Sequence, residues 1–354
     1  MSVRGICLVG AVLALAACGE SRGEGKTDAS AAERIAAALD PCAEGRGAFA
    51  QNVCQNRTLS TLDSQVRETL VAESADVSDA GAQLLVQNQN RWREAQRIAC
   101  GVIDPDAAPT GAQQACLENE FRTRVQDARG AVQQVGGYTF QRVEVVDATP
   151  VTAEIASAAR VDADAPPAVV RDIRYPRIDG DQTPEVRRFN ELVAQEPQFR
   201  LQDATNETVD YTIAYAGPDL ISVRFTLSQD TLGAANVTNT VKGVTVLMTE
   251  GRMLTEADVF RPNSGWQDFI TRRAMAEIGR QFSDYPNFPP RRDVYETATK
   301  PHLWLITERG LVLLFPPLSF GGSHADGGAE VTIPWSDLRD YLNPQAPAPI
   351  RPSA

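Results

Sequence analysis

The chain has 354 residues, with 34 Lys and Arg against 46 Asp and Glu, which gives a formal net charge of −12. This charge does not suit a nucleic-acid binder, because phosphate contacts require a basic surface, but it suits attraction of a basic protein partner. The chain has only two His, so we expect no His-based metal site and no other cofactor. We expect a binding protein rather than an enzyme.

Residues 1–17 have the features of a bacterial secretory signal segment. Arg4 precedes an apolar run, 6–17, that is too short to cross a bilayer as a helix. The run ends in the lipobox pattern Leu-Ala-Ala-Cys, so Cys18 is the expected site of lipid attachment. Gly19 follows instead of Asp, and the resemblance to Gram-negative lipoproteins then implies an outer-membrane anchor that faces the periplasm.

Residues 18–37 are expected to form a tether, because the segment 20–32 is small, polar and without apolar periodicity. Residues 38–135 are expected to form a helical domain, and residues 138–343 an α+β domain. Residues 344–354 contain four Pro and are expected to form an exposed tail.

Four cysteines remain once Cys7 leaves with the signal segment and Cys18 takes the lipid. An even number in an exported chain indicates two disulfides, and a metal site is excluded because no C-x-x-C pair or nearby His exists. The sequence alone does not decide among the three connectivities. We favour the pairs that close local loops at one pole of the helices, Cys42–Cys54 and Cys100–Cys116.

Three stretches of the helical domain have apolar residues at helical spacing, from Leu59 to Leu70, from Leu85 to Ala99 and from Leu117 to Val132. A turn is predicted at 76–81 and a Pro-rich loop at 104–111. Three antiparallel helices of this length bury a thin core, so disulfides are a sensible supplement. We interpret Trp92 as a core anchor and Asp63 as a packing or hydrogen-bonding residue.

The four cysteines stand with three motifs, Leu59-x-x-Leu62-Asp63, Gln89-x-x-Trp92 and Phe121-x-x-Arg124. Together they resemble the N-terminal domain of LprI-like lysozyme inhibitors. Gln96 stands where that family usually has Arg, and Arg67 and Leu70 stand where Asn and Tyr are common. The resemblance therefore implies the fold more strongly than the binding surface.

Residues 138–343 alternate hairpins with helices, which predicts an antiparallel or mixed sheet. Hairpins are expected at 209–227 and 303–315, and helices at 184–195, 265–282 and 334–342. The predicted fold class is therefore a multidomain α+β protein: a disulfide-stapled three-helix domain, then an antiparallel or mixed sheet with helices.

Segments 173–176, 219–225, 254–260 and 310–334 resemble the domain of unknown function in the outer half of lysozyme-sensing anti-sigma-V factors. Gly233-Ala-Ala-Asn236 stands where that family often has Gly-Gly-Ala-His, which removes the one His that a catalytic or metal site could use. Ser323, His324 and Asp326 lie on a Gly-rich stretch, and we interpret them as an exposed loop rather than a catalytic triad.

Two further stretches contain closely spaced carboxylates or several prolines. Asp179 and Asp181 fit a turn better than a Ca²⁺ site, and residues 286–292 fit a connecting loop. Neither stretch is expected to carry the function.

Both resemblances concern modules associated with lysozyme. We expect an envelope lipoprotein that binds, and in doing so inhibits, lysozyme or another muramidase through a preorganised loop. Asp104 and Asp106 are the candidate partner-binding residues, and the loop 321–328 is a second choice. Other readings remain open: the two aspartates only solubilise an insertion, or the protein is a structural or sensing module that binds peptidoglycan or a protein without inhibition. A cell-wall hydrolase would need two carboxylates about 5–9.5 Å apart across a cleft.

Overall fold

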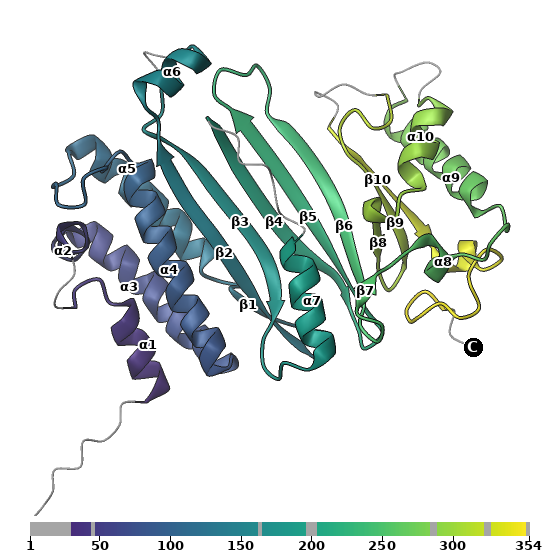
Figure 1. Cartoon of the computed structure of the whole chain (residues 1–354), viewed down its shortest axis with the longest axis horizontal. Coiled ribbons are helices and arrows are strands. Elements are labelled where there is room, and N and C mark those ends of the chain that lie inside the picture. The colour runs from purple at the N-terminus through teal and green to yellow at the C-terminus, as the bar shows by residue number, and fades with distance from the viewer. Residues whose placement is uncertain are drawn as a thin grey trace, which may run out of the picture.

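The computed structural model of the chain describes residues 30–43, 47–161, 165–195, 204–283, 289–321 and 327–351. Helices form one end of the molecule, a seven-stranded sheet forms the middle, and a three-stranded sheet with further helices forms the other end (Figure 1). The predicted α+β class, with disulfide-bonded N-terminal helices followed by a mixed sheet, is confirmed.

The N-terminal end consists of α1 (Ala31–Leu39), α2 (Ala48–Gln55), α3 (Arg57–Glu73), the 3₁₀ turn η1 (Ser74–Asp76), α4 (Asp79–Ala99) and α5 (Gly111–Asp127). The three predicted helices correspond to α3, α4 and α5, and each has a polar N-cap side chain that accepts a backbone N–H. Trp92 is 4 % exposed and packs edge-on against Phe121, so it is a core anchor.

Two boundaries of the helical part differ from the sequence-based expectation. Helix α1 starts inside the expected tether: Ser30 and Glu33 form a capping box, and Leu39 is fully buried. Helix α5 stops at Asp127 instead of continuing to Val132, because Gly130 adopts a positive φ and reverses the chain. Glu73 accepts the N–H groups of Gly130 and Val132, and strand β1 begins there.

The large sheet has the strand order β1-β2-β3-β4-β5-β6-β7. Its strands are β1 (Val132–Val135), β2 (Tyr138–Pro150), β3 (Ala168–Ile178), β4 (Thr205–Ala216), β5 (Leu220–Thr231), β6 (Thr238–Leu247) and β7 (Arg252–Met253). All neighbours are antiparallel except β3 and β4, between which the chain passes through α7 (Pro184–Gln195); α6 (Ala153–Ala159) lies between β2 and β3. The sheet is therefore mixed.

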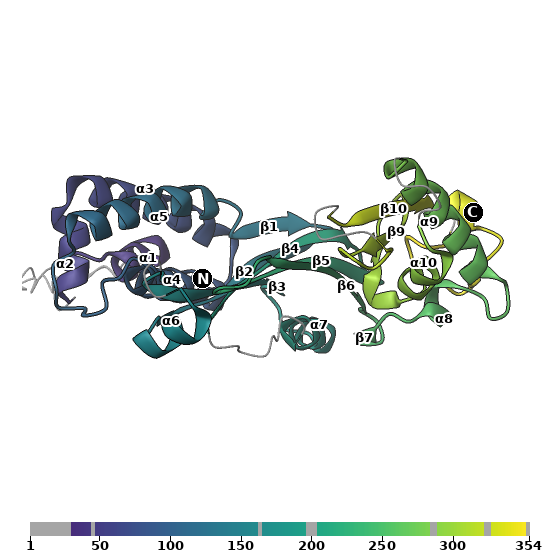
Figure 2. The same cartoon turned by 90° about the horizontal axis from the view of Figure 1, so that it is seen from above.

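The two faces of the large sheet are covered differently. Helix α7 covers one face, where Phe189 and Val193 pack among the buried strand residues Val209 and Val223. On the opposite face α3 and α5 rise at one end and β9 and β10 at the other (Figure 2). The strands between these two ends leave an open surface.

Helix α4 covers the edge of β2. Strand β1 pairs only with the first residues of β2, and beyond that point the side chain of Asn88 takes the place of a neighbouring strand. Its amide nitrogen donates to the carbonyl of Arg142 at 2.8 Å, and its oxygen accepts the N–H of Glu144 at 3.2 Å. Because an unpaired edge can recruit other chains, this contact both protects the sheet and fixes the helices to it.

The small sheet has the order β10-β9-β8, with β8 (Trp304–Ile306), β9 (Gly310–Phe315) and β10 (Ala329–Pro334). It is accompanied by α8 (Glu256–Val259), α9 (Trp266–Gln281), α10 (Arg291–Ala298), the turn η2 (Pro301–Leu303) and α11 (Trp335–Leu338). One face buries Leu311, Leu313 and Phe315 among the apolar residues of α9 and α10. The other face contacts the large sheet through Leu305 and Leu314.

The C-terminal segment differs from the expected exposed tail. Ala346 and Ile350 are fully buried in the core that α9 and α10 form with the small sheet. The N–H of Ala348 also donates to Asp219 at 3.1 Å. The closing helix is correspondingly short and spans only α11, because the chain then follows the surface of this core.

Candidate functional site

Both disulfides lie at one pole of the helices. Cys42 is bonded to Cys54 and Cys100 to Cys116, with Cα–Cα distances of 5.6 Å in each pair. These are the local pairs favoured from the sequence. The lipidation candidate Cys18 lies outside the described residues, and so do Ser323, His324, Asp326 and the first three residues, 286–288, of the Pro-rich stretch 286–292.

The loop between α4 and α5 is held in place by more than its disulfide. The guanidinium of Arg97, which is 4 % exposed, donates to the carbonyls of Val102 and Ile103, the second at 2.7 Å. Gln113 donates to the carbonyl of Gly101 at 2.7 Å, and the N–H of Phe49 donates to Pro105 at 3.1 Å. The loop is therefore preorganised from both sides, and the sequence analysis did not identify Arg97 as its anchor.

Asp104 and Asp106 are both exposed on this loop, as expected. Asp104 accepts the N–H of Asp106 at 2.9 Å, which stiffens the turn. Within the part of the chain that the structure describes, neither carboxylate forms an ion pair, and the neighbouring Ile103 is 48 % exposed. The loop thus presents two free negative charges beside one apolar side chain.

A buried charge cluster joins the helices to the large sheet. Glu144 on β2 pairs with Arg124 of α5 at 2.8 Å and with Arg142 at 2.7 Å, and the side chains of Glu144 and Arg124 are each 1 % exposed. Burial raises the pKa of Glu144, but Arg124, Arg142 and Arg174 outweigh it and hold that pKa below its ordinary value. This cluster is structural, because it is closed to solvent.

The motif residues Gln89 and Arg124 contact each other beside this cluster. The Gln89 side chain accepts from Arg124 at 2.9 Å, and Arg124 lies over the ring of Trp92 at 5.2 Å from its centroid. Asp63 is also buried and is paired with Arg93 and Arg67. Asp63 is thus a hydrogen-bonding residue of the core.

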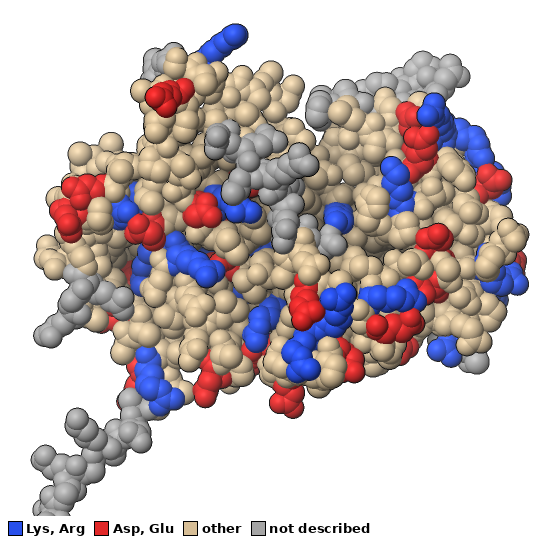
Figure 3. All heavy atoms as spheres, viewed as in Figure 1, with Lys and Arg blue, Asp and Glu red and all other residues tan. Residues whose placement is uncertain are grey.

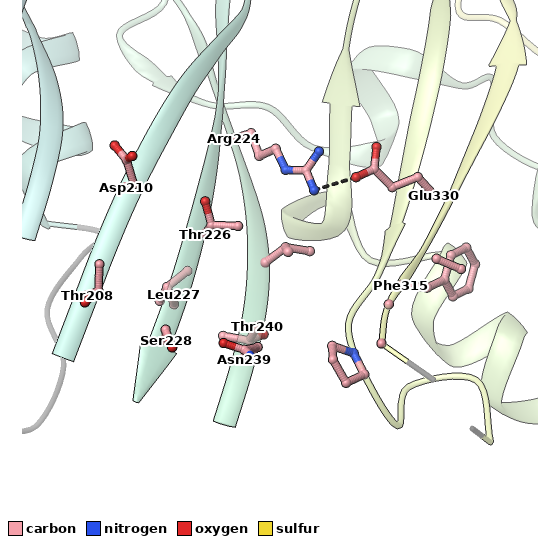
Figure 4. A pocket seen from close by; sticks show the side chains of 15 residues that line it. Thr208, Asp210, Arg224, Thr226, Leu227, Ser228, Asn239, Thr240, Phe315 and Glu330 are labelled. Atoms are coloured by element: carbon pink, nitrogen blue, oxygen red, sulfur yellow. Dashed lines mark ion pairs between the residues drawn. The ribbon is translucent and has the colours of Figure 1, made fainter. Parts of the chain in front are cut away.

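A cleft of about 440 Å³ lies between the open face of the large sheet and the small sheet. Alternate residues of β4 and β5 form one wall, among them Asp210, Arg224 and Thr226, while Phe315 and Glu330 lie on the other (Figure 4). An ion pair between Arg224 and Glu330 bridges the two walls. Local sequence patterns do not indicate this cleft, because the strands of its two walls lie about 100 residues apart in the chain.

The carboxylate of Asp179 is engaged by other groups of the protein. Asp179 accepts the backbone N–H and the hydroxyl of Ser78 at 2.6 and 2.8 Å and so binds the start of α4. Among all the described residues, no three His, Cys, Asp or Glu side chains gather as a metal site would require. Within the same ranges no helix is both long and apolar enough to span a membrane.

The charge on the surface is mixed. On the face drawn in Figure 3, basic and acidic side chains are interspersed over the large and the small sheet. That face therefore offers no continuous basic surface of the kind that nucleic-acid backbones require.

Comparisons with known proteins show a similarity between the C-terminal part of the chain and solved structures. No family model and no curated protein matches the chain. The C-terminal 60 % or so matches structures of the DUF3298 family, the domain found in anti-sigma-V factors. A DUF3298 member from Bacteroides fragilis has a TM-score of 0.41 at 12 % identity, over 60 % of this chain and 96 % of its own. A DUF3298 protein from Pseudomonas aeruginosa has a TM-score of 0.43 at 12 % identity, over 61 % of this chain and 98 % of its own.

Proposed function

We propose that the protein is an exported, lipid-anchored binding protein that engages lysozyme or another basic muramidase and inhibits it with the α4–α5 loop. The observation that carries the proposal is the preorganised display of Asp104 and Asp106. A loop that is already fixed loses little conformational entropy on binding, so more of its contact energy becomes affinity. Its free carboxylates can meet basic groups that line a muramidase cleft.

The overall charge supports the same type of partner. At a net charge of −12 the protein attracts basic proteins and accelerates their encounter, while the loop supplies the specific contact. The resemblance of residues 38–135 to LprI-like inhibitors points to the same partner, and the loop lies in that part of the chain. The N-terminal resemblance itself stays a prediction.

Lysozyme inhibition by the double variant Asp104→Ala/Asp106→Ala tests the proposal. Hen lysozyme activity on cell-wall suspensions is measured against a soluble form of the protein that starts after residue 18. We expect the variant to inhibit at least tenfold more weakly, because two charged contacts to the enzyme are lost.

The matched control is Asp181→Ala/Glu185→Ala, which removes two exposed carboxylates at the start of α7. It should inhibit as the parent does. Equal inhibition by all three proteins, or none by the parent, rules out the loop as the inhibitory site. Binding of lysozyme without inhibition would instead favour a sensing or structural role.

The lipid anchor is tested separately. Replacing Cys18 by Ser should move the protein from the membrane fraction to the soluble fraction, because a hydroxyl does not accept the thioether-linked lipid. Fractionation and palmitate labelling in a Gram-negative host measure this. Unchanged sedimentation together with an unlabelled parent chain would contradict the anchor.

A further inference from the structure

The cleft between the two sheets displays polar side chains that the fold itself does not use. The side chains of Thr208, Thr226, Ser228 and Asn239 have no hydrogen-bond partner among the described residues. Some hydroxyls elsewhere on these strands are paired within the fold: Ser222 bonds to Thr245 at 2.9 Å, and Thr205 to Thr231 at 3.0 Å. The unpaired groups that line the cleft are therefore available to a ligand.

Their spacing suits an extended chain. Thr226 and Ser228 are two residues apart on β5, and their register partners Asp210 and Thr208 are two residues apart on β4. Alternate residues of a strand lie about 6.8 Å apart, which is also the repeat of an extended peptide. Donors and acceptors at this interval can meet every second peptide group of such a chain, namely the groups that face the same side.

The charges in the cleft favour a basic side chain. Arg224 is already paired with Glu330, and among the described residues Asp210 accepts a hydrogen bond only from the backbone N–H of Tyr211, at 2.8 Å. Asp210 is exposed, and within the described ranges no cation is paired with it. Figure 4 shows its carboxylate on the wall opposite Glu330. One uncompensated negative charge therefore faces the cleft.

The apolar groups distinguish a peptide from a sugar chain. Glycan sites commonly stack a sugar ring on an exposed aromatic face, but the aromatic side chain of this lining, Phe315, is only 1 % exposed. The lining instead includes the aliphatic side chains of Leu227, Val241 and Pro317, and Leu318, which follows Pro317 in the chain, is 49 % exposed. Leu318 also has a positive φ of 70°, a conformation that a bulky residue rarely adopts.

We propose that this cleft binds an extended segment of a protein partner that carries one basic side chain. The basic group pairs with Asp210, the peptide groups bond to Thr208, Thr226, Ser228 and Asn239, and flanking apolar side chains contact the aliphatic part of the lining. The volume of about 440 Å³ is of the size of a small-ligand site and accommodates a few residues. The site is separate from the α4–α5 loop and does not depend on it.

The site is tested by measuring peptide binding to a soluble form of the protein that includes residues 30–351. The probe is a fluorescein-labelled pool of five-residue peptides with Lys in the centre and Val, Leu, Ser or Thr at the other positions. A second pool has Glu in the centre, and the trimer of N-acetylglucosamine serves as the glycan probe. We expect the Lys pool alone to bind, measured by fluorescence anisotropy.

Three variants locate the binding. Asp210→Asn should weaken binding of the Lys pool about tenfold, because a charged contact becomes a neutral one. Thr226→Trp should abolish it by filling the cleft, while Asp147→Asn, an exposed aspartate on β2, should leave it unchanged. Circular dichroism melting checks that each variant is folded.

Other outcomes overturn the site. These are equal binding of the Lys and Glu pools, no binding of the Lys pool, an unchanged Asp210→Asn variant, or binding of the glycan trimer in place of the peptides. The variant Asp104→Ala/Asp106→Ala should bind the Lys pool as the parent does, so failure of the proposed lysozyme contact and failure of this cleft are distinguishable.

Discussion

Replacing Glu144 by Ala should destabilise the protein by about 3–5 kcal/mol, because it leaves two largely buried guanidinium groups without their carboxylate. Arg124 is 1 % and Arg142 10 % exposed at the side chain, so water cannot compensate for the lost partner. Urea unfolding followed by circular dichroism measures the change. A variant as stable as the parent would contradict the importance of the cluster.

The stability that Glu144 contributes should decrease as the pH falls. The arginines hold the pKa of Glu144 in the folded protein below the pKa of a glutamate in the unfolded chain. The contribution of Glu144 to the free energy of unfolding is therefore fully present when the pH is above the unfolded-state pKa. It is lost as the pH falls through the folded-state pKa. The gap between parent and Glu144→Ala should therefore shrink in acid. The control Glu296→Ala, which breaks an exposed pair with Arg292, should leave the unfolding midpoint unchanged. A gap that widens in acid would show that the assigned ionisation is wrong.

The second large effect concerns the disulfide at the α4–α5 loop. The variant Cys100→Ser/Cys116→Ser should lose about 3 kcal/mol, because the cross-link between residues 16 apart restricts the unfolded chain. Arg97 and Gln113 still anchor the base of the loop, so the fold should survive while the tip with Asp104 and Asp106 becomes less ordered. Under the proposed function, inhibition of lysozyme should then weaken as well.

The stabilities are compared by the urea concentration at the midpoint of unfolding. It is measured for the parent, the double Ser variant and the fully reduced parent. The reduced parent should be the least stable of the three, since it also loses Cys42–Cys54. Identical midpoints for the parent and the variant would mean that the loop is held by hydrogen bonds alone.

Local patterns predicted the local structure well. The apolar patterns that begin at Leu59, Leu85 and Leu117 correspond to α3, α4 and α5. They could be predicted because the apolar repeat that indicates a helix lies entirely within that helix. Helix α7 spans Pro184–Gln195 as expected, and the predicted hairpin at 209–227 lies in β4 and β5. The local disulfides were favoured for the same reason, since each joins neighbouring elements.

Long-range contacts could not be predicted from such patterns. Asp179 looked like a turn residue, yet it bonds to Ser78, 101 positions earlier in the chain. Ile350 looked like part of an exposed tail, because nothing in a Pro-rich segment shows which core will receive it. Asp210 and Thr226 lie in the predicted hairpin at 209–227, but nothing in that segment shows that the later β10 turns one of its faces into the wall of a cleft.

The side chain of Asn88, which stands in for a strand at the edge of β2, bears on how such a chain could be inherited. Through this contact the helical part covers a backbone edge that could otherwise pair with other chains. A recombination event that transplanted the sheet without α4 would expose the backbone of Arg142 and Glu144 to other copies. The large sheet therefore depends on α4 to keep this part of its edge from pairing with other copies of the chain.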